Sequence, residues 1–396
     1  MSEIRSRMSR MKSPSIFISA GEISGDRHAA ALVREIKAIR PDISFFGMGH
    51  TALRDQGVDI IADLTTSSTV GFLEPIKHLP KILMAYIKLK YAIKKRRPDV
   101  IVVVDFQGFH MVLLKAIRAL KIPIIYYIAP QEWLWGSEKG GRVVVNYTDK
   151  ILCIFRQEAA FFKRLGGQAI YVGNPTLAET QATQSKRALC NHLGVDPSAT
   201  LIGVFPGSRP QEIKRMTPLL LAAAQETAKK IPNAAIIVSI SSHVYHHELQ
   251  HITKDLSHVY SYSDSSYGLI PHLDVSLLTS GTISLEHACF GTPAVVAYQF
   301  SWVSYQLLRC LFTEKFKSIQ WISLPNLIAQ RSIIPEFIQA EATASALSQE
   351  AHRLIQDQGH RQRQLDGFIS VKELLEPANA VVRAAQEVVE TLPDLR

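Results

Sequence analysis

Short, almost purely apolar runs recur along the chain and constrain its fold more than any other feature. They have the length of buried strands, and stretches rich in Ala, Leu, Lys and Glu separate them. The runs are residues 15–18, 43–46, 100–104, 122–128, 151–155, 201–205, 234–240, 275–278 and 294–297. Apolar strands that alternate with helices predict parallel sheets covered by helices on both faces.

A polar stretch at residues 180–186 separates two series of such runs. The pattern therefore predicts two doubly wound, Rossmann-like α/β domains, at residues 15–180 and 181–340. Residues 1–14 are basic and rich in Ser and Met, so we expect a flexible N-terminus. From residue 341 to 396 the pattern is helical and polar, which predicts peripheral C-terminal helices.

The composition narrows the class of protein and its partners. The 396 residues carry 44 basic and 35 acidic side chains, a formal net charge of +9. This surplus favours an anionic partner: a nucleotide, a nucleic acid or an anionic membrane surface. The four cysteines are far apart, which fits a reducing cytosol and provides no zinc motif. No apolar run approaches the roughly 18 residues of a spanning helix, so we expect any membrane contact to be peripheral.

A polar loop with two glycines follows the first apolar run. Glycines allow a tight turn and close backbone approach to a ligand, and Ser24 or Asp26 can cap a following helix. Open α/β sheets bind ligands at the carboxyl ends of their strands. The candidate residues of this loop are Gly21, Glu22, Ser24 and Asp26. The alternative is an ordinary strand-to-helix turn without a ligand.

The run at residues 100–104 leads directly into Asp105. A carboxylate at the end of a buried strand is costly unless it is paired or used in chemistry. Asp105 is therefore a candidate general base, able to take a proton from a sugar hydroxyl. His110 is a weaker candidate. The structural alternatives are a helix cap for Asp105 and a core histidine for His110, and for His110 the structural alternative is favoured.

Two tryptophans, Trp133 and Trp135, follow the run at residues 122–128. Aromatic rings at a strand end can line a carbohydrate or acyl pocket, so both are candidates for substrate binding. The alternative is that they pack over the end of the sheet.

Two glycine-containing loops follow runs of the second domain, and both suit phosphate. In residues 206–209, backbone amides, a hydroxyl and a guanidinium can bind phosphate oxygens. Residues 280–282 open a helix whose first amides can hold a pyrophosphate, and Glu286, one turn later, can accept hydrogen bonds from a ribose. The candidate nucleotide-binding residues are Gly207, Ser208, Arg209, Ser280, Gly281, Thr282 and Glu286. The alternatives are a solvated arginine and an ordinary first-turn acid.

Residues 77–97 combine lysines and arginines with apolar and aromatic residues, and no acid lies between Glu74 and Asp99. A basic amphipathic helix is typical of elements that bind a membrane surface. The alternative is a solvated cationic face on a helix that connects two strands.

Together these segments resemble lipid-A-disaccharide synthases, bacterial glycosyltransferases of the GT-B fold. The resemblance runs from about Ile16 to Gln339. Its most specific segments are residues 20–26, 206–209, 280–286 and 323–327, with Pro335 and Glu336. It implies two Rossmann-like domains that face a cleft, with the UDP site in the second domain.

The resemblance also implies a reaction. The family joins UDP-2,3-diacylglucosamine to 2,3-diacylglucosamine 1-phosphate through a β-1,6 bond, which gives lipid A disaccharide 1-phosphate and UDP. It implies inversion at the anomeric carbon without a metal or cofactor. It further implies a cytoplasmic protein associated peripherally with the inner membrane, no nucleic-acid partner, and it allows a homodimer. The implied UDP-binding residues are Arg209, Ser280, Thr282, Glu286 and Asn326.

Two positions depart from the family pattern. Some members have Asp-x-Pro-Asp-Phe-Asn where this chain has residues 105–110, so Gly108 replaces the second acid. The expected base is then Asp105, followed by Glu22 and His110. Glu132 stands where the family usually has an apolar residue, which affects the expected acceptor pocket.

Two other functions stay open at this point. A UDP-sugar 2-epimerase of the GT-B fold would share the nucleotide loops but would need no lipid surface. A non-enzymatic, basic peripheral membrane protein would need only the basic segment. No DNA- or RNA-binding motif is visible, which disfavours a nucleic-acid role.

Overall fold

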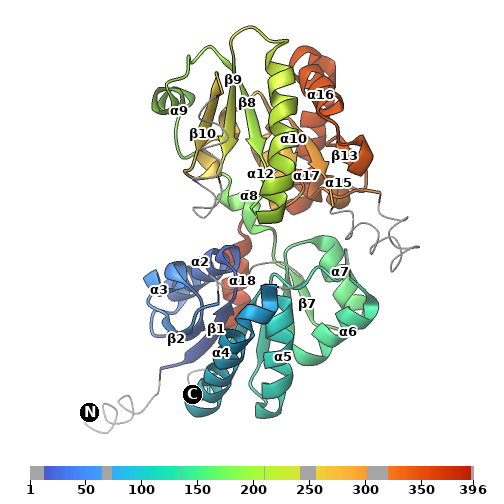
Figure 1. Cartoon of the computed structure of the whole chain (residues 1–396). Helices are drawn as coiled ribbons and strands as arrows, with labels where there is room; N and C mark the ends of the chain where they lie inside the picture. Colours follow the sequence, from blue (N-terminus) through green and yellow to red (C-terminus); the bar gives the residue numbers. More distant parts are fainter. Residues whose placement is uncertain are drawn as a thin grey trace. The chain divides into compact units, whose positions relative to one another are not determined.

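The computed structural model describes residues 13–64, 74–134, 136–208, 210–240, 256–300 and 320–393. The chain forms two compact units, one of residues 1–175 with 377–396 and one of residues 176–376. Each unit contains one sheet with helices against it (Figure 1). Residues 1–12, most of the expected flexible N-terminus, lie outside the described residues.

The first unit contains a seven-stranded sheet in the order β3-β2-β1-β4-β5-β6-β7, and every pair of neighbours is parallel. The strands are β1 (Ser15–Ala20), β2 (Ser44–Met48), β3 (Asp59–Ala62), β4 (Val100–Val104), β5 (Ile124–Tyr127), β6 (Lys150–Cys153) and β7 (Ala169–Tyr171). The helices are α2 (Ile23–Ile39), α3 (Thr51–Asp55), α4 (Glu74–Arg96), α5 (Gln107–Ile117), α6 (Glu138–Tyr147), α7 (Arg156–Arg164) and α18 (Ala380–Val389). The strand order reverses between β1 and β4, as in a doubly wound fold.

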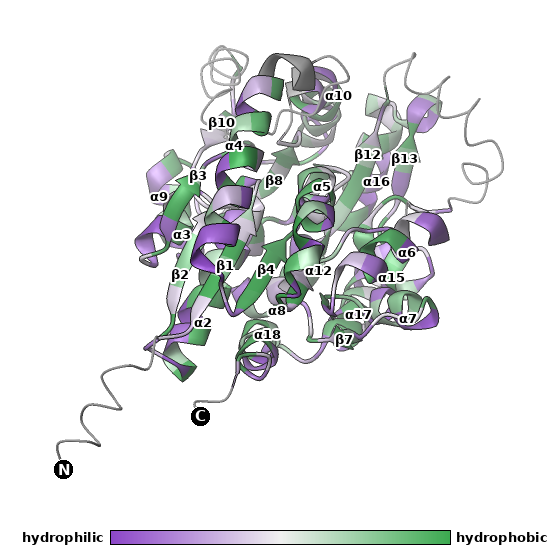
Figure 2. Cartoon of the chain, turned by 90° about the horizontal axis from the view of Figure 1, so that it is seen from below, coloured by the Kyte–Doolittle hydropathy of each residue, from purple (hydrophilic) through white to green (hydrophobic). Residues whose placement is uncertain are grey.

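Strand β4 shows why these runs are apolar at every position. Val102 packs in a cluster with Leu32 of α2 and Ala384 of α18. Its neighbour Val103 packs on the other side of the sheet, in a cluster with Leu89 of α4. Both faces of β4 are thus buried, and the strand is hydrophobic throughout (Figure 2). Each such buried side chain stabilises the fold by about 1.5–3 kcal/mol.

The second unit contains a six-stranded parallel sheet in the order β10-β9-β8-β11-β12-β13. The strands are β8 (Thr200–Phe205), β9 (Ala234–Ser239), β10 (Val259–Tyr262), β11 (Val275–Thr279), β12 (Ala294–Tyr298) and β13 (Glu336–Ile338). The helices are α8 (Pro175–Glu179), α9 (Lys186–Leu193), α10 (Pro210–Ala228), α12 (Thr282–Phe290), α15 (Leu324–Ala329), α16 (Ala344–Gln356) and α17 (Gln358–Leu375). Here the strand order reverses between β8 and β11.

The nine apolar runs all correspond to strands, and all nine strands are interior to their sheets. The strands that the runs do not reveal are β3, β7, β10 and β13, which are the four edge strands. Most of their residues are only half-buried. An edge strand therefore lacks the continuous apolar pattern by which the interior strands are recognised.

The C-terminal helices do not form one peripheral group, which corrects the expectation for residues 341–396. Helices α16 and α17 belong to the second unit, where α16 packs on α10 and α17 on α12. Helix α18 returns to the first unit and lies beside α2 (Figure 1). Lys150 Nζ and Glu387 Oε2, 2.8 Å apart, also join β6 to α18. The buried apolar face of each helix determines which unit it packs on. The overall polar composition of residues 341–396 does not show these faces.

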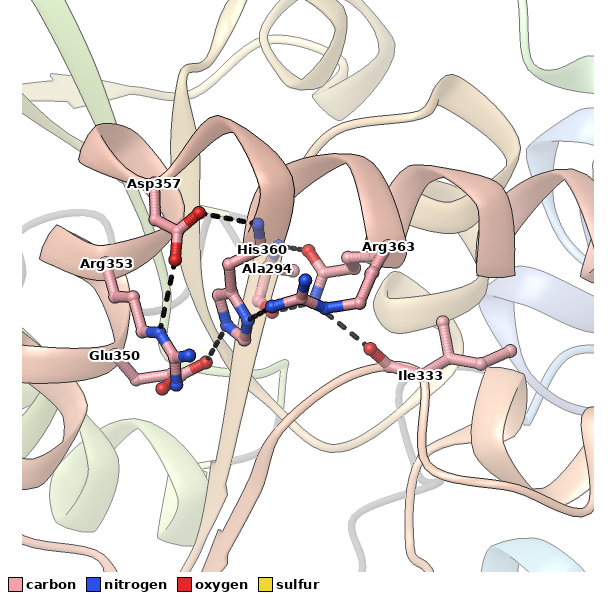
Figure 3. A network of polar contacts seen from close by, with 8 residues as sticks. Ala294, Ile333, Glu350, Arg353, Asp357, His360 and Arg363 are labelled. Atoms are coloured by element: carbon pink, nitrogen blue, oxygen red, sulfur yellow. Dashed lines mark hydrogen bonds and ion pairs between the residues drawn. The ribbon is translucent and has the colours of Figure 1, made fainter.

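Helix α17 is fixed to β12 by a buried side chain. The Gln364 amide accepts from the backbone N–H of Ala294 at 2.9 Å and donates to the Ala294 carbonyl at 2.9 Å. His360 Nε2 lies 2.6 Å from Glu350 Oε1, which joins α17 to α16 (Figure 3). These contacts make α17 an integral part of the second unit.

Helix α4 buries one side and exposes the other. Ala85, Leu89 and Ile93 pack in the core of the first unit. Its exposed residues include both apolar side chains, such as Leu83 and Ile87, and lysines, such as Lys88. Among the described residues, no helix has both the length and the apolar character needed to cross a membrane.

Candidate functional site

The carboxyl ends of β1 and β4 lie side by side where the strand order of the first sheet reverses. Ala20 pairs with Val104, so the loops that follow the two strands begin at the same edge. Such a switch point is where open α/β sheets bind ligands. The fold therefore brings together residues 21–26 and 105–110, which are far apart in the sequence.

Gly21 allows these two segments to touch. A Cβ atom at Gly21 would overlap the ring of Phe106. A Cβ atom at Gly25 would lie 3.8 Å from the Cβ atom of Asp105. The first turn of α2 is thus packed closely against the turn that carries Asp105, and glycine is required at position 21 for that contact.

Asp105 lies in a strained turn and is half-buried. Asp105 and Phe106 have φ values of 52° and 53°, the left-handed region that residues with a Cβ atom seldom adopt. Burial raises the pKa of Asp105, and a hydrogen bond with the backbone of Phe106 and the charge of His28 partly oppose this. A carboxylate with a raised pKa is a better general base near neutral pH, so Asp105 remains the leading candidate. His28 gave no signal in the sequence, because only the fold brings α2 to the end of β4.

His110 is a core residue, which corrects its place among the candidate bases. Its side chain is fully buried. Nδ1 lies 2.7 Å from the Asp105 carbonyl oxygen and Nε2 lies 2.8 Å from Ser19 Oγ. Burial lowers the pKa of His110 to about 4, so the ring is neutral. With both nitrogens engaged inside the fold, His110 has no means to take a proton from substrate.

Among the other residues of the first loop, Glu22 and Ser24 stay candidates and Asp26 does not. Glu22 is the residue before α2 and is half-buried, and Ser24 is exposed in the first turn. Asp26 is buried, and its two oxygens accept from the backbone N–H groups of His50 and Ala52 at 2.7 and 2.9 Å. Asp26 therefore positions the loop before α3 and does not face substrate.

Gly108 lies in the first turn of α5 and is exposed. A Cβ atom there would have no described atom within 4 Å. The space for a side chain at this position is therefore present, although the second acid of the family pattern is missing.

Glu132 links the turn at the end of β4 to the loop that follows β5. Its Oε1 accepts from Gln107 Nε2 at 2.5 Å and its Oε2 accepts from the backbone N–H of Ser137 at 2.9 Å. A Cβ atom at Gly136 or Gly140 would overlap the Glu132 carboxylate, so the two glycines make room for it. This acid is thus accommodated by neighbouring residues of the same chain.

Trp133 packs on Phe155, with ring centroids 5.6 Å apart. Its indole nitrogen is buried, and it has no hydrogen-bond partner within the described part of the chain. Trp133 remains a candidate for substrate binding, and Trp135 lies outside the described residues.

At the end of β8, Gly207 has a φ of 106°, a conformation that favours glycine. Ser208 is exposed beside it. The next residue, Arg209, lies outside the described residues. Because β8 and β11 are the strands at which the order of the second sheet reverses, this loop lies at the switch point of that sheet.

The loop after β11 lies at the same switch point. Gly281 and Thr282 are exposed where α12 begins, so the first amides of the helix are available to an anion. Ser280 Oγ donates to the Ile322 carbonyl at 2.8 Å, and Glu286 accepts from Ser266 Oγ at 3.2 Å. This arrangement suits a diphosphate at the helix N-terminus.

Asn326 is fully buried and supports the loop without facing a ligand. Its Oδ1 accepts from the backbone N–H groups of Ile333 and Ile334 at 2.7 and 2.8 Å. Its Nδ2 donates to the Ile334 carbonyl and to Glu336 Oε1 at 2.8 and 2.7 Å. All four hydrogen-bonding positions of the amide are used, which corrects the expectation that Asn326 binds UDP directly.

Glu336 holds the same segment in place. Its carboxylate accepts from the backbone N–H groups of Ile322 and Ser323 at 2.7 and 2.9 Å. Because the Ile322 carbonyl accepts from Ser280, Glu336 and Asn326 indirectly orient the loop before α12.

The chain is similar to known proteins over nearly its whole length. A family model described as lipid-A-disaccharide synthetase matches residues 16–389. A lipid-A-disaccharide synthase of Myxococcus xanthus is 33% identical over 394 residues, covering 96% of this chain and 98% of the relative. A lipid-A-disaccharide synthase of Geobacter sulfurreducens is 31% identical, covering 97% of this chain and 99% of the relative.

Solved structures show the same fold. A UDP-GlcNAc 2-epimerase from Neisseria meningitidis, bound to UDP-GlcNAc, has a TM-score of 0.60 at 13% identity over 95% of this chain and 99% of its own. The Methanocaldococcus jannaschii enzyme with UDP-GlcNAc and UDP has a TM-score of 0.61 at 12% identity, with the same coverage. At this identity they confirm the expected GT-B-like fold and nothing more. The family model and the full-length relatives show the family: the chain belongs to the lipid-A-disaccharide synthases, glycosyltransferases of lipid A biosynthesis.

Proposed function

We propose that the protein joins UDP-2,3-diacylglucosamine to 2,3-diacylglucosamine 1-phosphate through a β-1,6 bond, with release of UDP. Membership of the family supports the reaction class. The observation that carries the residue assignment is the pair of switch points. One bears a half-buried carboxylate, Asp105, and the other bears the exposed N-terminus of α12.

In this mechanism the Asp105 carboxylate removes the proton from the 6-hydroxyl group of the acceptor. The hydroxyl oxygen then attacks the anomeric carbon of the donor from the face opposite UDP. The new carbon–oxygen bond forms as the bond to UDP breaks, and its electron pair leaves with the diphosphate. The anomeric carbon is inverted, and Asp105 later releases its proton to water.

The leaving diphosphate needs positive charge or amide dipoles as its charge develops. We assign this role to the first amides of α12, to the loop at Gly207 and Ser208, and to Arg209. Glu286 binds the ribose hydroxyls. Ser280 and Asn326 support this site through the 322–336 segment that their hydrogen bonds fix.

The test is to supply both diacylated substrates and to measure UDP and disaccharide. We expect Asp105→Asn to lower kcat by about a hundredfold or more, the order associated with a general base. Asp59→Asn is the matched control, because Asp59 is an exposed acid paired with Arg96. A loss of about tenfold or less for Asp105→Asn would transfer the role to Glu22.

The epimerase alternative makes a different prediction in the same assay. An epimerase would convert UDP-N-acetylglucosamine to its 2-epimer and form no disaccharide. Turnover of that kind by the wild-type protein, without disaccharide formation, would refute the proposed reaction.

We further propose that α4 contacts the cytoplasmic surface of the inner membrane. Leu79, Leu83, Ile87 and Tyr91 are spaced four residues apart, so they form one stripe along the helix, and each is more than half exposed. Lys81, Lys88, Lys94 and Lys95 are exposed on the same helix. An apolar stripe flanked by cations matches an anionic lipid surface, where acyl chains meet charged headgroups.

Vesicles of phosphatidylglycerol test this contact by co-sedimentation. We expect Leu83→Ser with Ile87→Ser to weaken binding at least about tenfold, since each side chain contributes about 1.5–3 kcal/mol when buried. Val112→Ser with Ile369→Ser is the matched control, because these apolar residues are equally exposed on α5 and α17. Equal loss in both double variants, or none in either, would contradict the assignment to α4.

A further inference from the structure

The backbone carbonyl of Asp105 receives two hydrogen bonds from buried side chains. His110 Nδ1 lies 2.7 Å from this oxygen, and the Tyr126 hydroxyl donates to it at 2.8 Å. His110 comes from α5 and Tyr126 from β5, and both are fully buried. The oxygen they bind belongs to Asp105, which has the left-handed backbone conformation, and the next residue, Phe106, has it too. Such a conformation persists only where surrounding contacts enforce it.

The direction of each hydrogen bond follows from the chemistry of the groups. A carbonyl oxygen only accepts, so His110 Nδ1 must carry the proton. Nε2 of the neutral ring is then an acceptor, and the Ser19 hydroxyl donates to it at 2.8 Å. Burial keeps Tyr126 protonated by raising its pKa and keeps His110 neutral by lowering its pKa to about 4. Ser19 on β1 thus holds the His110 ring in place. That ring and Tyr126 of β5 in turn hold the Asp105 carbonyl at the end of β4.

We propose that His110, Tyr126 and Ser19 are positioning residues that hold the Asp105 turn left-handed and so aim the Asp105 carboxylate at the acceptor hydroxyl. This inference rests on the proposed role of Asp105 as the base. It assigns to His110 an indirect role in the reaction, through a backbone atom of its neighbour. It also accounts for a polar residue at a fully buried site, where an apolar side chain would pack without needing partners.

Two substitutions of His110 separate positioning from packing. The Asn amide nitrogen lies as many bonds from Cα as His Nδ1, so His110→Asn keeps a donor for the Asp105 carbonyl. The Gln amide reaches the place of His Nε2, so His110→Gln keeps the contact with Ser19 and removes that donor. Asn is also smaller than His and leaves a cavity, whereas Gln nearly fills the space.

The variant that loses more activity, His110→Gln, should therefore be the one that loses less stability. We expect His110→Gln to lower kcat about a hundredfold, as a small misplacement of a catalytic group can, with KM for the donor nearly unchanged. We expect His110→Asn to retain most of kcat although its melting temperature falls further. UDP affinity, a property of the second unit, should match the wild type in both.

Tyr126→Phe provides an independent variant with a matched control. It removes the second donor to the Asp105 carbonyl, and we expect kcat to fall. Tyr127→Phe changes the neighbouring tyrosine, which packs on the opposite side of the same sheet and is equally buried. We expect it to leave kcat unchanged.

The outcomes distinguish this inference from the proposed function. If the wild-type protein forms no disaccharide, the proposed function fails. If it does, and kcat in the four variants simply follows melting temperature, the residues are structural and the inference is wrong. A further check uses Asp105→Asn combined with His110→Gln. We expect the double variant to be no slower than Asp105→Asn alone, since the two changes remove the same contribution.

Discussion

At the scale of single residues, three glycines of the candidate site meet three different needs. Gly21 makes room for the Phe106 ring, and Gly207 has a positive φ. Gly281 has neither reason: its φ of 165° is extended, and a Cβ atom there would have no described atom within 4 Å. A glycine without either reason is consistent with the proposed approach of the UDP diphosphate to the start of α12.

Gly281→Ala should therefore weaken UDP binding without destabilising the protein. A Cβ atom that keeps a phosphate from the first amides of α12 removes a charge-assisted hydrogen bond, so we expect about a tenfold loss of affinity or more. Calorimetric titration with UDP measures it. Gly359→Ala, in the first turn of α17, is the control and should bind as the wild type. An unchanged affinity for UDP in Gly281→Ala would show that UDP does not approach the backbone at this position.

Glu158 is a buried acid whose ionisation opposes folding. Its Oε2 accepts from the backbone N–H groups of Ile154 and Phe155 at 2.8 and 3.3 Å. Burial nevertheless raises the pKa of Glu158 from 4.5 to about 8. Between these values the folded protein binds more protons than the unfolded chain, so the free energy of unfolding falls as pH rises through this window.

Glu158→Gln should flatten this dependence. A neutral amide oxygen can still accept from the two backbone groups, and it has no charge to bury. Between about pH 5 and pH 8 we expect the free energy of unfolding of the wild type to fall by a few kcal/mol relative to that of the variant, because the other titrating groups contribute equally to both proteins. Urea unfolding at the two pH values measures the difference. An equal dependence of the free energy of unfolding on pH in both proteins would show that Glu158 does not cause it.

Several site residues could not be assigned from the sequence, because their partners come from distant segments. Asp26 binds backbone groups of residues 50 and 52, and Asn326 binds Glu336 and the backbone of residues 333 and 334. A polar residue in a loop motif gives the same sequence pattern whether its side chain faces a ligand or supports the loop. The sequence could locate the loops, but the fold decides which side chains point outward.

At the scale of elements, interior strands could be predicted from the sequence and edge strands could not. β4 is buried on both faces and is apolar at all five positions, whereas β3 at the edge begins with the exposed Asp59. The return of α18 to the first unit was likewise hidden. Its buried residues Ala380, Ala384, Ala385 and Val388 show helical spacing but not which unit they cover.

The attachment of α17 to β12 can be tested at Gln364. Gln364→Ala leaves the backbone N–H and carbonyl of Ala294 buried without these side-chain bonds. We expect it to destabilise the second unit by about 2–6 kcal/mol, since each of the two buried unpaired groups costs about 1–3 kcal/mol. Urea unfolding measures this. Gln362→Ala, on the exposed side of α17, is the control and should stay within about 0.5 kcal/mol of the wild type.

At the scale of the whole molecule, each unit contains one buried neutral histidine among the residues that the structure describes. His110 lies in the first unit and His287 in the second, where its ring packs edge-on to Phe205. Burial lowers the pKa of each from 6.5 to about 4. As pH falls between these values the unfolded chain takes up protons that the folded chain does not, so both units lose stability in the same window.

Between about pH 6.5 and pH 4 we expect each histidine to lower the free energy of unfolding by on the order of 3 kcal/mol, a contribution opposite in sign to that of Glu158. His287→Leu should reduce the loss in the second unit, because the apolar side chain does not titrate. His192→Leu, at an exposed histidine of α9, should leave it unchanged. Thermal unfolding at a series of pH values measures both, and an unaltered acid slope in His287→Leu would contradict the expectation.

The return of α18 to the first unit has a consequence for synthesis of the chain on the ribosome. The first unit begins with β1 yet lacks α18 until after the whole second unit has been translated. At about 5–20 residues per second, the intervening 200 or so residues take roughly 10–40 s. During this time the face of α2 that α18 will cover is exposed to solvent. The second unit can therefore complete its fold before the first, although the first unit is the one that the ribosome begins.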